Sequence, residues 1–193
     1  MLLSALALAL ALNLGPALPA EGAPPPTTLA LMRQKLLDEL NRHRAGLSVS
    51  PLHVDALAQQ AAQMHSVEME RAAKLRHEDS SGHSPLWRYT SLGGSAQAYG
   101  ENVGYFSRGV VNPDLLWSSI AELDRRMMAE QPPNDGHRKN ILSVRYSAVG
   151  IGVAVGPNGV YITEDFVGYP RARLYGTDHS VIFQLAMMER DGL

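Results

Sequence analysis

The sequence predicts an α+β fold, and three observations lead to this prediction. Apolar residues recur at helical spacing in the first half of the chain and again after Asn112. Two β-rich runs, residues 149–155 and 160–166, flank an Asn158-Gly159 turn and predict a β-hairpin. Because the helical segments precede the hairpin instead of alternating with strands, an α+β arrangement fits better than repeated βαβ units.

The overall composition narrows the class of protein. With 193 residues, the chain is long enough for one domain with a sizeable hydrophobic core. Its net charge of −2 provides no broad basic surface, so we expect no nucleic-acid partner. The absence of cysteine excludes disulfides, a thiolate nucleophile, cysteine-ligated zinc and a lipidated cysteine anchor.

Residues 1–23 are expected to be a secretory signal peptide, the alternative being a buried helix of the domain. Residues 2–12 form an apolar run that is shorter than the ~20 residues needed to cross a bilayer, so the mature form should contain no stable membrane span. A basic segment at the start is missing, so either the start lies upstream or the signal is atypical. The expected location is secreted, or periplasmic within a bacterial cell envelope.

The first predicted helix covers residues 29–44. A stiff proline-rich spacer at residues 24–28 precedes it. Thr27 or Thr28 is available as its N-terminal cap, and Gly46 supplies its expected stop.

Two further helices are predicted from their start signals. The Ser50-Pro51 pair is expected to begin a helix with an alanine-rich face that allows close packing against a neighbour. Asn112, which is followed by a proline, is expected to cap a later helix. This helix should run to near Glu130, because Pro132 forces it to end.

The remainder of the chain holds the hairpin and a tail. Gly150 and Gly152, both in the first strand of the hairpin, indicate that another backbone approaches closely. Residues 169–193 are expected to be a C-terminal extension, irregular at first and then forming a short amphipathic helix.

Three separate segments carry side chains suited to metal or acid–base chemistry. His77 follows the second helix, and Glu101 lies in a loop-like segment between Gly100 and Gly104. His137 follows a turn and precedes aliphatic residues that fix it to the core. If two imidazoles and a carboxylate converge, they suit Zn²⁺ or a similar divalent cation with open positions for water. The alternative is three unrelated surface residues. Three other histidines are expected to be solvated: His43, His53 and His179.

Six short motifs follow one another along the chain: Asn41-Arg42-His43-Arg44-Ala45-Gly46-Leu47, His77, Gly100-Glu101-Asn102-Val103, Gly136-His137-Arg138-Lys139-Asn140-Ile141-Leu142, Val149-Gly150-Ile151-Gly152 and Thr163-Glu164-Asp165-Phe166. In this order they resemble the CAP superfamily, which comprises cysteine-rich secretory proteins, antigen 5 and pathogenesis-related class 1 proteins, in its cysteine-free bacterial form. The domain of this family is also called the SCP domain, and the resemblance covers residues 29–168.

The resemblance implies a three-layer α-β-α sandwich with a small antiparallel sheet and a central cavity. In the family this cavity is lined by two histidines and two glutamates, and some members bind a divalent cation there. Carried over to this sequence, the histidines are His77 and His137 and one glutamate is Glu101, which together are the expected metal ligands.

The fourth member of the cavity departs from the family pattern. The family places a glutamate three residues after a helix tryptophan, but three residues after Trp117 this chain has Ile120. On a helical wheel Glu130 falls near the apolar stripe and Glu122 on the wet face, so Glu130 is the preferred substitute and a frayed, solvated Glu130 is the alternative. Asp124 is a weaker candidate.

The resemblance favours a secreted binding module whose His/Glu cavity holds a divalent cation or a small ligand, with no defined reaction. Its partner would be an unknown small ligand or envelope component, and no organic cofactor is expected. The alternative is a metal-dependent or acid–base hydrolase of envelope polymers or peptides, in which Glu130 would act as general base. No serine lies in a G-x-S-x-G motif that would mark it as a nucleophile.

Overall fold

The computed structural model describes residues 24–107 and 112–169, and it has the predicted α+β fold. The expected signal peptide and the expected helix in the C-terminal extension lie outside these residues. The elements in chain order are α1 (Pro26–Ala45), β1 (His53–Val54), α2 (Ala56–Ala72), α3 (Pro85–Ser91), β2 (Ala98–Phe106), α4 (Pro113–Met128), α5 (Gly136–Leu142), β3 (Ala148–Gly156) and β4 (Gly159–Gly168).

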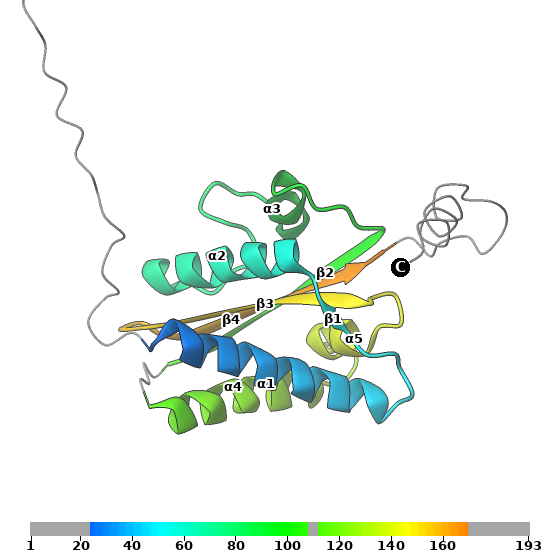
Figure 1. Cartoon of the computed structure of the whole chain (residues 1–193), viewed down its shortest axis with the longest axis horizontal. Helices are drawn as coiled ribbons and strands as arrows, with labels where there is room; N and C mark the ends of the chain where they lie inside the picture. Colours follow the sequence, from blue (N-terminus) through cyan, green and yellow to red (C-terminus); the bar gives the residue numbers. More distant parts are fainter. Residues whose placement is uncertain (1–23, 108–111, 170–193) are drawn as a thin grey trace, which may run out of the picture.

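The elements form three layers, as the family resemblance implies (Figure 1). Helices α2 and α3 cover one face of the sheet, and α1, α4 and α5 cover the other (Figure 1). No helix in the described ranges is both long enough and apolar enough to cross a membrane.

The sheet has the strand order β1-β3-β4-β2. The three long strands are antiparallel, and the predicted hairpin is the β3–β4 pair. The sheet is nevertheless mixed, because the two-residue strand β1 pairs parallel to β3 at the edge. Strand β1 could not be predicted from the sequence, since two residues are too few to show a period of two.

Alternation along β4 decides which layer each side chain meets. Val160, Ile162 and Phe166 belong to the core with α1 and α4, whereas Val167 packs on the side of α2 and α3. Glu164 therefore lies on the face covered by α1 and α4, and Asp165 lies on the face covered by α2 and α3.

Two helix starts differ from the sequence predictions. Helix α1 begins without any side-chain cap, so neither Thr27 nor Thr28 acts as one. Helix α2 does not begin at Ser50-Pro51. The chain first pairs with the sheet through β1, and Asp55 then caps α2 by accepting a backbone N–H.

The alanine-rich face of α2 packs directly on the glycines of β3. The sequence predicts a close approach at each of these surfaces, but not that they meet each other. A Cβ atom on Gly150 would lie 2.0 Å from the carbonyl carbon of Ala58, and one on Gly152 would lie 2.1 Å from the carbonyl oxygen of Ala62. Both contacts are with backbone, which cannot rotate away. The spacing between helix and sheet is therefore set by the absence of side chains at these positions.

Replacing Gly150 with alanine is expected to lower the free energy of unfolding by about 2–3 kcal/mol, because the new methyl group overpacks a rigid contact. Urea denaturation measures this loss. Gly136→Ala is the matched control, because nothing lies within 4 Å of a Cβ atom there. Equal stability of the two variants would show that α2 can move away from the sheet at little cost.

Candidate functional site

A pocket of about 560 Å³ opens where the loop after α2, the strand β2 and the segment leading into α5 meet. Four of its lining residues are those selected from the sequence: His77, Glu101, Glu130 and His137. The other lining residues are Asn102, Asn134, Gly136, Lys139 and Asn140. The fold therefore brings to one pocket residues that lie tens of positions apart in the chain.

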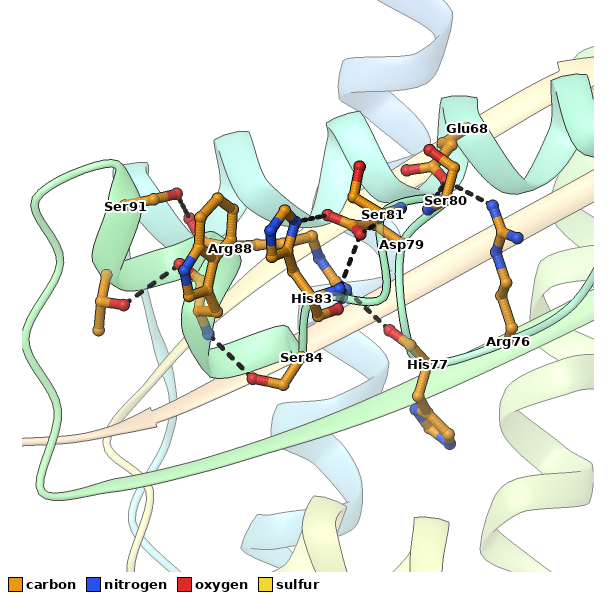
Figure 2. Close-up of polar contacts among 12 residues, drawn as sticks. Glu68, Arg76, His77, Asp79, Ser80, Ser81, His83, Ser84, Arg88 and Ser91 are labelled. Carbon is orange, nitrogen blue, oxygen red and sulfur yellow. Dashed lines mark hydrogen bonds and ion pairs between the residues drawn. The ribbon is translucent and has the colours of Figure 1, made fainter.

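His77 is held by a buried carboxylate and an arginine. Its Nδ1 atom lies 2.7 Å from Oε1 of Glu101, whose side chain is 2% exposed, and Oε2 of Glu101 pairs with Arg88. Arg88 also donates to the backbone carbonyl of His77 at 2.7 Å. Figure 2 shows this bond, with the His77 ring pointing away from the Asp79–His83 pair. The hydrogen bond that His77 donates to Glu101 raises the pKa of His77, because the carboxylate favours the imidazolium form.

Glu101 was expected in a loop-like segment, but it lies within strand β2. Gly100, which precedes Glu101, allows close packing and does not form a turn, because a Cβ atom on it would lie 2.4 Å from the hydroxyl oxygen of Tyr146. Strand β2 gives the Glu101 carboxylate a fixed position, because the backbone of β2 is paired with that of β4.

His137 is held in a similar way by Glu130. Nδ1 of His137 pairs with Oε1 of Glu130, and the His137 backbone N–H donates to Oε2 at 2.9 Å. Helix α4 ends at Met128, so Glu130 does not extend its last turn. It lies instead at the N-terminal end of α5, where unpaired backbone N–H groups favour a carboxylate.

The other two acids considered for the fourth position lie elsewhere. Glu122 pairs with Arg125 and Arg126 on the exposed face of α4, and these hydrogen bonds lower its pKa to about 2. Asp124 points toward α1, where its Oδ2 lies 2.7 Å from Nε2 of His43.

Two asparagines join the strand to the helix behind the pocket. Asn140 donates to Oδ1 of Asn102 at 2.9 Å and to the carbonyl of Glu101 at 3.2 Å. Asn102 in turn donates to the carbonyl of His137 at 3.3 Å. The sequence analysis assigned no role to these amides or to Arg88. Both asparagines occur in the quoted motifs, but nothing in the sequence marks Arg88.

The arrangement leaves Nε2 as the available nitrogen of each pocket histidine. Within residues 24–107 and 112–169, neither His77 nor His137 has a hydrogen bond at Nε2. Imidazoles held through Nδ1 by a carboxylate are typical of metal-binding histidines, because the carboxylate fixes the tautomer and the ring orientation. The pocket does not present a ready set of three ligands, however. Within the part of the chain that the structure describes, ligand atoms within 4.8 Å of one another occur in a different group: Glu39, His43 and Asp124.

Comparison with known proteins places this chain in a family. The model of the cysteine-rich secretory protein (CAP) family matches residues 37–168. An uncharacterized protein of Bacillus subtilis, YkwD, is 25% identical over 143 residues, which are 74% of this chain and 49% of that protein. The chain thus spans about half the length of this relative.

Two solved structures show the same fold. An extracellular SCP-domain protein from Bacillus anthracis superposes with a TM-score of 0.57 at 21% identity, over 70% of this chain and 39% of that one. An outer surface protein from Borrelia burgdorferi superposes with a TM-score of 0.59 at 13% identity, over 72% and 94%. Since the family model covers well over half of the sequence, this chain belongs to the cysteine-rich secretory protein (CAP) family, in a form without cysteine.

Proposed function

We propose that the protein is an exported binding module whose pocket holds a divalent cation of the zinc type through His77 and His137. The observation that carries this proposal is that both histidines line one pocket and that each is fixed through Nδ1 by a carboxylate. The remaining coordination positions would be open to water, a small ligand or a component of the envelope.

In this proposal Glu101 and Glu130 orient the histidines. Both oxygens of Glu101 are already engaged, one with His77 and one with Arg88. Both oxygens of Glu130 are engaged with His137. Using either carboxylate as a ligand would break one of these bonds, whereas using Nε2 breaks none. The role of Glu101 as a direct ligand therefore has less support than its role as the partner of His77.

The proposed location is outside the cytoplasm. The B. anthracis protein is described as extracellular and the B. burgdorferi protein as an outer surface protein. A fold without cysteine can function in an oxidising compartment, since it gains its stability from packing.

Zinc titration of the chelator-treated protein tests the pocket. At a free zinc concentration of a hundred times Kd, ligand linkage should raise the free energy of unfolding by about 2.7 kcal/mol. His77→Ala and His137→Ala should each remove one bound zinc ion per chain, measured by calorimetry. Glu130→Gln should weaken zinc binding by about 10- to 100-fold, as loss of a carboxylate partner of a metal-binding histidine does.

His53→Ala is the control, because His53 is exposed on β1 and lies outside the pocket. It should leave both the zinc content and the stabilisation unchanged. Wild-type zinc content in both pocket variants would contradict the pocket as a metal site.

The hydrolase alternative makes a separate prediction. A zinc-loaded hydrolase would turn over peptides or peptidoglycan fragments, and His77→Ala and His137→Ala would abolish that turnover. Zinc binding without turnover on both substrate classes would support the binding module.

A further inference from the structure

A second group of metal-binding side chains lies between α1 and α4, away from the pocket. Glu39 and His43 are one turn apart on α1, and Asp124 faces them from α4. One ligand atom from each of the three lies within 4.8 Å of the other two. None of the three lines the pocket described above.

The geometry within the group is close to that of a coordination site. Nε2 of His43 lies 2.7 Å from Oδ2 of Asp124 and 3.8 Å from Oε1 of Glu39. Around a tetrahedral zinc ion with bonds of about 2.0–2.1 Å, neighbouring ligand atoms are about 3.3 Å apart. Small rotamer adjustments would therefore bring all three atoms to coordination distance.

One buried carboxylate oxygen of this group has no partner. Oδ1 of Asp124, a residue 2% exposed, makes no hydrogen bond within the described ranges. A buried carboxylate oxygen without a donor is costly, and a cation is one of the few partners that would satisfy it.

We infer that Glu39, His43 and Asp124 form a second divalent-cation site, which ties α1 to α4 and is separate from the pocket. One imidazole and two carboxylates suit zinc, with a fourth position open to water. Magnesium is a poor fit, because it prefers oxygen ligands throughout and near-ideal octahedral geometry.

The surroundings allow an ion to enter. His43 and Glu39 each retain 23% exposure of their side chains, so the ion would enter from the α1 side and Asp124 would form the floor of the site. His43 was expected to be solvated, and its partner on a helix 81 positions away could not be seen in the sequence. Arg42 pairs with Glu39, but its side chain is 67% exposed and can turn into solvent.

Zinc binding to a pocket-deficient protein tests this site without relying on the pocket. The background is a His77→Ala, His137→Ala double variant of the full chain, treated with chelator and then titrated with zinc by calorimetry. We expect one zinc ion per chain in this background, and none after addition of either His43→Ala or Glu39→Gln. Magnesium in large excess should not displace the zinc, and His53→Ala should change nothing.

Two results would overturn the inference. One is a pocket-deficient protein that binds no zinc, and the other is a zinc content that His43→Ala leaves unchanged. If His43→Ala lowers the melting temperature in chelator without altering zinc content, the three side chains form only an ion pair between helices. Glu39→Gln keeps the test valid if His43→Ala fails to fold, because Glu39 is partly exposed.

Discussion

Replacing Arg44 with alanine is expected to lower the free energy of unfolding by about 5 kcal/mol, since four backbone carbonyls would lose their donor and two of these hydrogen bonds are fully buried. Arg44 has no exposed surface, and its guanidinium donates to four backbone carbonyls at 2.8–3.0 Å. These carbonyls belong to Ser50, Ile141, Ser143 and Tyr146. The side chain thus ties the end of α1 to the end of α5, the helix that carries a pocket histidine.

Urea denaturation of matched variants measures this effect. Arg44→Lys should show an intermediate loss, because lysine keeps the charge but lacks the planar fork that reaches four acceptors. Arg42→Ala is the control on the same helix, since this side chain is mostly exposed and should change stability by no more than about 0.5 kcal/mol. A loss for Arg44→Ala no larger than that for Arg42→Ala would show that water replaces the guanidinium without penalty.

The second large effect is expected from Glu164→Gln, which should raise the free energy of unfolding at alkaline pH. Burial, together with the charge of Asp124, raises the pKa of Glu164 to about 8 from 4.5. The folded state therefore holds a proton that the unfolded state has already released, and stability falls as pH rises from about 4.5 to 8. A shift of this size corresponds to up to about 5 kcal/mol above pH 8.

Glu164→Gln removes this titration and keeps an acceptor for the side-chain amide of Asn102, which donates to Oε2 of Glu164 at 3.0 Å. The variant and the wild type should have similar stability at pH 4.5 in chelator, and the variant should be clearly more stable at pH 8.5. Subtracting the two profiles cancels the titration of the histidines and of Asp165, which both proteins share. Glu122→Gln should show no such divergence, because its partners keep the pKa of Glu122 low. Parallel profiles for Glu164→Gln and wild type would mean that Glu164 is ionised throughout.

The elements that the sequence predicted well are those governed by local rules. The β3–β4 hairpin follows from an Asn-Gly turn between two β-rich runs, and the cap at Asn112 from its side chain and the proline after it. Close packing was also predicted at the alanines of α2 and at the glycines of β3, but the sequence did not show that these two surfaces meet. Strand β1 and the start of α2 were missed, since pairing with β3 determines both.

The sequence by itself determined the residue types available for chemistry: two histidines and a glutamate in the motifs of a known family, and no cysteine. Only the tertiary structure decided how they are used. It gave Glu130 the role of holding His137, because the end of α4 and the start of α5 meet there, and it joined His43 to Asp124 across two helices. Helical and strand periods specify which face a side chain occupies, whereas the partner on the opposite face is set by packing between segments far apart in the chain.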